Sequence, residues 1–365
     1  MLRSVLALPD GRIANAAATW HATHRPALLD LLDQCIYGPA PPASAINATR
    51  VAAGDLPHGT WEDWRIALWP DTPPLSVLLC LPHRLPAPCY LGLNFRGNHT
   101  VSRAEVPAPA GFGAYGVPDV RDAHRSTMDW CVDGITRRGW GLCTAFYGEL
   151  EPDRAEGPAL SRTWRSAGLP AGALSAWAWL IQRLVDLLAA DARCDARRMV
   201  AIGHSRLGKA ALLATARDPR IAMAVANGSG CGGAACFADC SPGAETLAQI
   251  LRFSHWFHPA LAPDPAAVPV DMHHLLACIA PRPLLLTNAE DDDWADQAGQ
   301  LRTLQAAAPA WHLLGVQAQP PSALPALGGG AAGSVLRYAW RVGPHCLCPA
   351  DWAAVFAATA AELPG

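Results

Sequence analysis

One serine stands in a sequence context that could make it a nucleophile. Ser205 lies in the segment Met-Val-Ala-Ile-Gly-His-Ser-Arg-Leu-Gly-Lys-Ala (199–210), where an apolar run ends at a glycine and a helical pattern follows. A sharp strand–turn–helix lifts a serine hydroxyl above a sheet, and the helix N-terminus beneath it favours developing negative charge. The usual pattern is Gly-x-Ser-x-Gly, but here Leu207 takes the second glycine position and the glycine follows at Gly208. The segment predicts a nucleophile elbow with a displaced glycine; an ordinary turn with a buried serine is the alternative.

The same segment holds Lys209, the single lysine of a chain whose other 27 basic residues are arginines. Gly203 through Lys209 also match the first seven positions of the phosphate-binding pattern GxxxxGK[ST]. The eighth position is Ala210, so the hydroxyl that would bind Mg²⁺ is missing. His204 and Arg206 also stand where backbone amides would have to curl around a phosphate. A phosphate-binding loop is therefore disfavoured.

An acid and a histidine follow the serine in the order that a nucleophile elbow requires. Acidic residues 290–293 come directly after the apolar run 284–287, and His345 follows the last strand pattern. The ends of strands are where the acid and base of a Ser-His-Asp triad belong. The acidic run has a solvated loop as its alternative; it lacks the glycine and glutamate of a calcium-binding EF-hand. Together the three elements predict a serine hydrolase.

Strand patterns alternate with helical patterns around these residues, which predicts an α/β fold with a mostly parallel, doubly wound sheet. The predicted strands are 75–81, 89–95, 140–146, 199–203, 221–226, 284–287 and 335–342, and the predicted helices are 174–190, 207–216, 296–308 and 350–360. We interpret residues 1–365 as a single α/β domain. Residues 1–70 are expected to form an N-terminal wrap on the main body, and residues 319–334 a loop before the last strand.

The composition excludes several classes of protein. Hydrophobic residues make up 51% and charged residues 16% of the 365 residues, which excludes an intrinsically disordered chain. A formal net charge of −3 disfavours a nucleic-acid partner. Uninterrupted apolar stretches are too short to predict a membrane span. The first ten residues lack the apolar run of a signal peptide, so we expect a cytoplasmic protein, or an extracellular or periplasmic one if a leader was removed.

Several other residues have structural interpretations that are simpler than functional ones. The twelve cysteines include no CxxC pair, so we expect small buried side chains rather than a zinc site. The four histidines at 255, 258, 273 and 274 show no helical HExxH pattern. We expect them to be hydrogen-bonded core or loop histidines rather than metal ligands.

On these motifs the chain resembles the glucuronoyl esterases of carbohydrate esterase family 15, in particular bacterial members described as acetylxylan esterase-like. The Ser-Arg-x-x-Gly-Lys segment is its most specific feature, because it accounts for both the displaced glycine and the lone lysine. The resembling segments are 91–100, 203–209, 227–234, 270–273, 279–283, 294–296, 313–315 and 351–352.

The resemblance implies an α/β-hydrolase fold and a role for each matching residue. It assigns Ser205 as nucleophile, His345 as base, Arg206 as oxyanion donor through its amide and guanidinium, Lys209 as ligand of glucuronate hydroxyls, Trp294 as a wall of that pocket, and Glu245 as a neighbour of the sugar.

The position of the triad acid departs from part of the family. Many members carry it just before a Ser-Gly-x-Gly-Gly run, where this chain has Gly228. Other bacterial members carry it two residues before the tryptophan, which here is Asp292, with Asp291 as the alternative. A disulfide of the fungal members cannot form, because its two positions are His204 and Cys346.

The implied reaction is hydrolysis of a uronic-acid ester of a plant polysaccharide through an acyl-enzyme, with no metal or organic cofactor. An acetylxylan esterase or other carbohydrate deacetylase is the alternative enzyme. A noncatalytic carbohydrate-binding relic is the alternative outside catalysis, and the presence of both Ser205 and His345 argues against it. The sequence defines neither the alcohol nor the oligomeric state.

Overall fold

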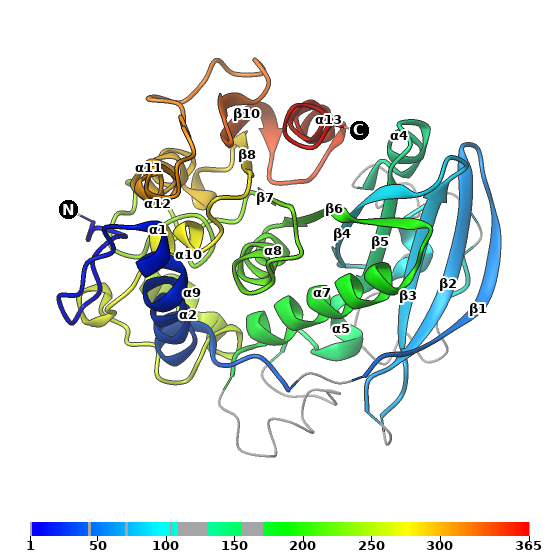
Figure 1. Ribbon diagram of the computed structural model, residues 1–365, viewed down its shortest axis with the longest axis horizontal. Helices are drawn as coiled ribbons and strands as arrows, with labels where there is room; N and C mark the ends of the chain where they lie inside the picture. Colours follow the sequence, from blue (N-terminus) through cyan, green and yellow to red (C-terminus); the bar gives the residue numbers. More distant parts are fainter. Residues whose placement is uncertain are drawn as a thin grey trace.

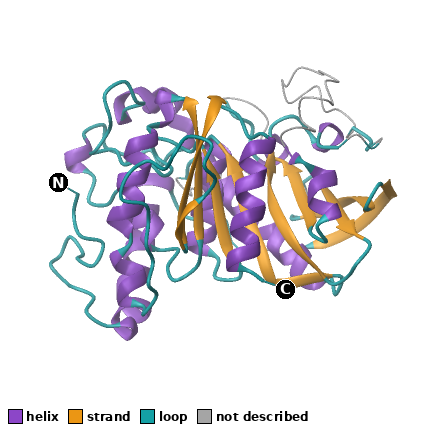
Figure 2. Ribbon diagram, turned by 90° about the horizontal axis from the view of Figure 1, so that it is seen from above, coloured by secondary structure: helices purple, strands orange, loops and turns teal. Residues whose placement is uncertain are grey.

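A ten-stranded sheet runs through the protein, and helices cover both of its faces (Figures 1 and 2). The computed structural model describes residues 2–42, 45–69, 72–102, 104, 106–108, 130–154 and 171–364. The strands follow one another across the sheet in the order β1-β2-β3-β5-β4-β6-β7-β8-β10-β9. They are β1 (Asn47–Leu56), β2 (Gly59–Ala67), β3 (Leu75–Pro82), β4 (Ala87–Asn94), β5 (Gly141–Phe146), β6 (Cys194–His204), β7 (Met223–Asn227), β8 (Leu284–Asp291), β9 (Ala332–Ser334) and β10 (Leu336–Pro344).

The middle of the sheet is parallel, from β5 through β4, β6, β7 and β8 to β10. Strands β4, β5 and β7 are buried along their whole length, which explains why they are continuous apolar runs rather than alternating patterns. The antiparallel strands β1, β2 and β3 extend one side, and β9 the other. This arrangement confirms the predicted α/β class, and it gathers the carboxyl ends of six parallel strands at one edge.

Two groups of helices cover the two faces of the sheet (Figure 1). Helices α2 (Arg25–Leu32), α7 (Ala173–Ala190), α8 (Arg206–Arg217), α10 (Met272–Ala277), α11 (Gln297–Ala307) and α12 (Pro309–Leu313) enclose the larger hydrophobic core. Helices α4 (Val132–Arg137) and α13 (Pro349–Glu362) enclose a smaller core on the other face. Short helices α1 (Ala17–Thr19), α5 (Tyr147–Leu150) and α9 (Leu247–Ile250) lie in connections. By length and composition, α7 alone among the described helices could cross a membrane, and 78% of it is buried inside the protein, as in a core helix.

The predicted strands and helices are all present, most with ends shifted by a few residues. The expected N-terminal wrap contains more regular structure than its sequence indicated. Within it, β1 and β2 form a hairpin that extends the sheet, and α2 buries Leu28 and Leu32 in the larger core. The predicted loop 319–334 ends in the short edge strand β9. The residues of β1 are mostly exposed, so the strand lacks the apolar run that would predict it.

Candidate active site

Ser205 occupies a strained turn between β6 and α8. Its backbone has φ 55° and ψ −128°, a conformation that non-glycine residues rarely adopt. The turn is tight because Gly203 has no side chain: a Cβ there would lie 2.1 Å from the carbonyl oxygen of Leu207. Such a strained serine at the end of a central parallel strand is the geometry of a nucleophile elbow.

Strand register brings an acid next to a histidine. In the parallel pair β8 and β10, Asp291 is the partner of Pro344, so the following residues Asp292 and His345 lie side by side. His345 Nδ1 donates a short hydrogen bond to Asp292 Oδ2. Asp292 is only 6% exposed, whereas Asp291 and Asp293 are exposed. Of the three adjacent aspartates, the structure therefore brings Asp292 to the histidine.

The end of β7 packs directly against this pair. Gly228, which follows β7, has φ +52°, and a Cβ there would lie 3.0 Å from His345 Cε1 and 3.2 Å from Asp292 Oδ2. A side chain at position 228 would therefore compete with Asp292 for the space beside His345. Glycine leaves room for the carboxylate of Asp292.

A second histidine, His204, packs against the ring of His345. The ring centres of His204 and His345 are 4.3 Å apart, and His204 Nδ1 lies 2.5 Å from Asn227 Oδ1. Burial, together with the neighbouring His345, lowers the pKa of His204 to about 3. His204 is therefore neutral at physiological pH, so it does not oppose a positive charge on His345 as a second imidazolium would.

Arg206 is held in place by a half-buried acid, Asp153, from a distant segment. Its Nε donates to Asp153 Oδ2 at 2.7 Å, and its guanidinium carbon lies 5.1 Å from the ring centre of Phe95. Asp153 Oδ1 also accepts from Trp256 Nε1 at 2.5 Å and lies 3.0 Å from His255 Nε2. Burial acts to raise the pKa of Asp153, but the hydrogen bond from His255 and the charge of Arg206 outweigh it and leave the pKa below its ordinary value. An ionised Asp153 thus orients Arg206.

Lys209 lies one helical turn after Ser205 and is 4% exposed. Its ammonium donates to the carbonyl oxygens of Ser229 at 2.5 Å and Cys231 at 2.6 Å. Burial lowers the pKa of Lys209, and the nearby carboxylate of Glu245 opposes that shift. Two of the three ammonium hydrogens are used by the protein, which leaves one for a ligand.

Glu245 and Trp294 lie at the mouth of the same site. Glu245 is 7% exposed, and its backbone amide donates to the carbonyl oxygen of Trp294 at 3.1 Å. Trp294 is 41% exposed, and the guanidinium carbon of Arg252 lies 5.3 Å from the centre of its ring system. Burial raises the pKa of Glu245, and the charge of Lys209 acts against that shift.

Two cavities meet at Ser205. One, of about 360 Å³, is lined by Ser205, Arg206, Lys209, Glu245, Asp292, Trp294 and His345, together with Gly228, Ser229, Gly230, Arg252, Phe253, Trp256 and Ala295. The other, of about 320 Å³, shares Ser205, Arg206 and His345 and is otherwise lined by Leu93, Asn94, Phe95, Arg96, Trp130, His204, Cys346 and Leu347. All seven residues singled out from the sequence thus line the first cavity, at the carboxyl edge of the sheet.

The other three histidines singled out from the sequence also have protein partners, and His258 Nδ1 accepts from the amide of Ala260 at 3.0 Å. Asp271 caps α10 by accepting from the amide of Met272 at 2.8 Å, and His274 Nδ1 accepts from the amide of Asp271 at 3.1 Å. His273 Nε2 lies 2.8 Å from the carbonyl oxygen of Arg3. Over the described residues, His, Cys, Asp and Glu side chains form no group of three that could hold a metal ion.

Comparison with known proteins finds carbohydrate esterases among the relatives of this chain. A family model described as "Glucuronyl esterase, fungi" matches residues 166–315. The curated "Carbohydrate esterase MZ0003", from an unknown prokaryotic organism, is 28% identical over 375 residues, covering 95% of this chain and 86% of that protein. The "4-O-methyl-glucuronoyl methylesterase" of Hypocrea jecorina is 36% identical over 157 residues, which cover 40% of this chain and 34% of the fungal protein.

Solved structures extend the likeness to the whole chain. A glucuronoyl esterase from Solibacter usitatus superposes with a TM-score of 0.88 at 32% identity, covering 100% of this chain and 98% of that one. A promiscuous CE15 esterase from a marine bacterial metagenome gives a TM-score of 0.88 at 26% identity and covers 100% of this chain and 97% of that one.

Proposed function

Because the chain belongs to the glucuronoyl esterases of carbohydrate esterase family 15 and is a carboxylic ester hydrolase, we propose that it cleaves esters of glucuronic or 4-O-methylglucuronic acid in plant polysaccharides. The observation that carries the proposal is one cavity lined by a strained serine, a hydrogen-bonded histidine–aspartate pair and a buried lysine. Linkages of the lignin–xylan type are the substrates proposed, with a free uronate and an alcohol as products.

In the proposed first half-reaction, Ser205 Oγ attacks the ester carbonyl carbon while His345 Nε2 takes its proton. Asp292 holds Nδ1 protonated and stabilises the imidazolium that forms. His345 then gives its proton to the alcohol oxygen as the bond between that oxygen and the acyl carbon breaks. In the second half-reaction, water attacks the acyl carbon while His345 takes a proton from it. His345 then returns that proton to Ser205 Oγ as the bond between Oγ and the acyl carbon breaks, and the free uronate leaves.

Negative charge develops on the carbonyl oxygen in both half-reactions, and Arg206 is the proposed donor to it. Its backbone amide lies at the N-terminus of α8, and its guanidinium lines the cavity beside Ser205. A single donor of this kind typically stabilises the transition state by about 3 kcal/mol. The donor must be oriented before the charge appears, and the ion pair with Asp153 supports that orientation.

We expect Asp153→Asn to lower kcat for a methyl glucuronate ester tenfold to hundredfold, with little change in KM. The neutral amide leaves the guanidinium of Arg206 less firmly held, so charge stabilisation weakens in the transition state rather than in the ground state. Steady-state kinetics of Asp153→Asn, Arg206→Ala and the double variant measure this coupling. The double variant should have nearly the same kcat as Arg206→Ala alone, because without the guanidinium the change at Asp153 has little further effect.

Asp239→Asn is the matched control, because Asp239 pairs with Arg302 at 2.9 Å and lines neither cavity at Ser205. If the losses from Asp153→Asn and Arg206→Ala multiply in the double variant, Asp153 does not act through Arg206.

Uronate recognition is proposed for Lys209, Glu245 and Trp294. The third ammonium hydrogen of Lys209 and the carboxylate of Glu245 suit ring hydroxyls, and the half-exposed Trp294 presents an apolar surface to the sugar. The two charged groups lie in one buried region, where each acts to keep the other ionised.

Lys209→Arg should weaken hydrolysis of a methyl glucuronate ester by about tenfold to hundredfold, mainly through KM. The planar guanidinium cannot reproduce three compact donors, and a hydrogen bond to a charged group is worth about 1.5–3 kcal/mol. Aryl acetates lack the sugar ring and should lose much less activity. Equal losses on both substrates would assign the lysine a purely structural role, and Lys209→Met repeats the comparison without a guanidinium.

The proposed function is tested by assaying the wild-type enzyme on methyl glucuronate beside an acetylated xylose, at equal concentration. Preferential release of glucuronate supports the proposal. Preferential release of acetate would identify a carbohydrate deacetylase instead, and no hydrolysis of either ester would identify a binding protein without activity.

A further inference from the structure

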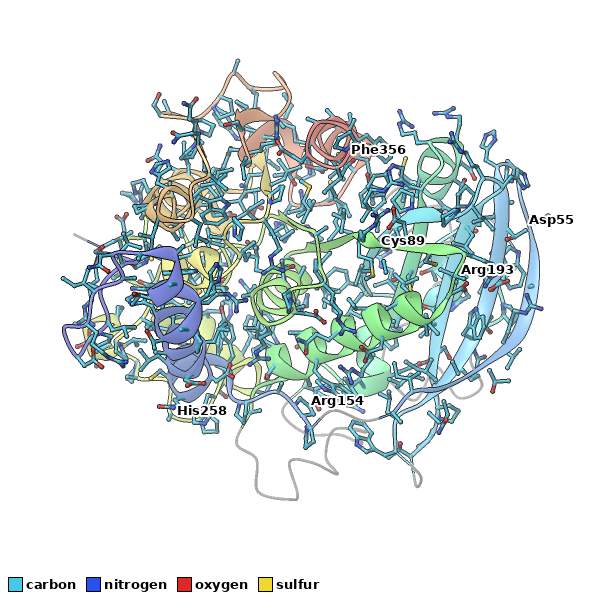
Figure 3. The ribbon with its side chains drawn as sticks, in the orientation of Figure 1. Asp55, Cys89, Arg154, Arg193, His258 and Phe356 are labelled. Carbon is cyan, nitrogen blue, oxygen red and sulfur yellow. The ribbon has the colours of Figure 1, made fainter. Side chains whose placement is uncertain are left out.

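We propose that a second cleft binds a uronate-bearing oligosaccharide without acting on it. The cleft lies at the amino ends of the parallel strands, opposite to the carboxyl ends that hold Ser205. The cleft has a volume of about 810 Å³, more than either cavity at Ser205. It lies where β4, β5 and β6 begin and where α4 and α13 end; Phe356, one of its walls, is labelled on α13 in Figure 3. Its lining is Arg84, Leu85, Pro86, Pro88, Tyr90, Arg138, Gly139, Trp140, Asp195, Arg197, Arg198, Phe356, Thr359, Ala360, Leu363 and Pro364.

The charges in the cleft favour an anionic ligand. Four arginines from three segments line it against a single acid, Asp195. That acid is already paired with Arg198 at 2.8 Å and with Arg197 at 3.6 Å. Arg84 and Arg138 have no carboxylate partner within the part of the chain that the structure describes. Guanidinium groups bind carboxylates through two parallel hydrogen bonds, so each of these two arginines is suited to a carboxylate.

Aromatic side chains beside the arginines favour a ligand that also has an apolar face. Trp140 is half-buried and stacks on Tyr90, with ring centres 4.6 Å apart. The guanidinium carbon of Arg138 lies 4.1 Å above the centre of the Phe356 ring. Arg138 Nη1 donates to the carbonyl oxygen of Gly134 at 3.0 Å. The stacking orients the guanidinium plane and leaves the remaining N–H groups available to a ligand.

A uronate residue of a polysaccharide carries both features, a carboxylate and a pyranose ring with an apolar face. Inorganic phosphate has no counterpart for Trp140, and a chain of net charge −3 is poorly suited to a polynucleotide. The residues that line the cleft include no serine, cysteine or histidine, so binding rather than catalysis is inferred.

The cleft and the catalytic cavity lie at the two ends of the same strands. The eight residues of β4 separate them by about 25 Å. A polysaccharide with several uronates would then bind the cleft through one free uronate. An esterified uronate further along the same polysaccharide would be hydrolysed by this enzyme molecule or by a second one. The choice of a polysaccharide ligand rests on the proposed function.

The test compares Arg84→Gln/Arg138→Gln with Arg12→Gln/Arg137→Gln, a double variant of exposed arginines that do not line the cleft. Calorimetric titrations use glucuronate-substituted xylotetraose, unsubstituted xylotetraose and inorganic phosphate. We expect wild type and control to bind the acidic oligosaccharide at two sites, and the Arg84/Arg138 variant to lose one of them, with at least tenfold weaker binding. Its kcat/KM for methyl glucuronate should stay within twofold of wild type, because that small ester uses only the catalytic cavity.

Three results would overturn the inference: unchanged binding in the Arg84/Arg138 variant, an equal loss of binding for unsubstituted xylotetraose, or phosphate binding as tight as that of the acidic oligosaccharide. Failure of the proposed function has a different signature. A wild-type enzyme that does not hydrolyse methyl glucuronate but binds the acidic oligosaccharide through Arg84 and Arg138 would refute the activity and support the cleft.

Discussion

Ser205→Ala abolishes measurable hydrolysis of methyl glucuronate, with an expected loss in kcat of about 10⁵- to 10⁶-fold. Without Oγ there is no acyl-enzyme, and the remaining oxyanion donors and binding groups act only on attack by water. Alanine keeps the Cβ of serine, so the unusual backbone conformation at this position is no more strained than before. The melting temperature should therefore stay within about 2 °C of the wild-type value.

Ser254→Ala is the matched control, since Ser254 is an exposed serine of the same molecule that lines neither cavity at Ser205. Turnover and thermal unfolding are measured on both variants. Near-wild-type turnover in Ser205→Ala would exclude a mechanism in which Ser205 is the nucleophile.

Asp292→Asn lowers kcat by an expected factor of about 10⁴, the second largest effect that we anticipate. Asparagine has nearly the shape of aspartate, but its amide can donate to His345 Nδ1 and so favour the wrong tautomer. It also carries no charge to stabilise the imidazolium. KM for methyl glucuronate should change little, because Asp292 acts on the histidine rather than on the sugar. Steady-state kinetics with thermal unfolding separate this loss from a folding defect.

The neighbours of Asp292 provide controls that differ by one position in either direction. Asp291 and Asp293 are exposed, so Asp291→Asn and Asp293→Asn should retain most of the activity. If Asp291→Asn lost activity while Asp292→Asn remained active, Asp291 rather than Asp292 would be the triad acid. Activity in all three variants would mean that His345 works without any of these carboxylates.

The residues that the sequence singled out as a candidate site lie together in the structure, around one cavity. Ser205 was recognisable because a strand pattern, a glycine and a helical pattern meet there within a few residues. His345 and the acidic run were recognisable because each follows a strand pattern, and parallel strands end at one edge of a sheet. Among the three aspartates, the spacing before Trp294 and the family resemblance favoured Asp292, with Asp291 as the alternative. The physical reason for the difference lies in the fold: burial separates Asp292 from its neighbours, and burial depends on the register between β8 and β10.

The groups that support the site were not predictable, because their partners are far away in the chain. Asp153 meets Arg206 across 53 residues and follows a short helix with no motif around it. His204 occupies the variable position of the elbow pattern, and its environment depends on Asn227 and His345 from other strands. The residues next to Asp153 and His204 in the sequence therefore do not predict these contacts.

The elements missed in the fold have similar causes. Strands β1 and β2 contain many polar and charged residues, and they are stabilised by cross-strand pairs such as that between Arg50 and Glu62 at 2.8 Å. Helix α10 has six residues, too few to display a helical repeat, and its start depends on the capping side chain of Asp271. Pairing and capping become visible only once the chain is folded.

The close packing of Gly228 against His345 limits where this site can carry its acid. A carboxylate at position 228 would face the same histidine as Asp292, because the ends of β7 and β8 both lie beside His345. Gly228 has φ +52°, and a side chain there would place its Cβ 3.0 Å from His345 Cε1 and 3.2 Å from Asp292 Oδ2. Moving the acid from β8 to β7 therefore requires a change in the backbone as well as two substitutions. The two strand ends are mutually exclusive positions for the acid in this chain.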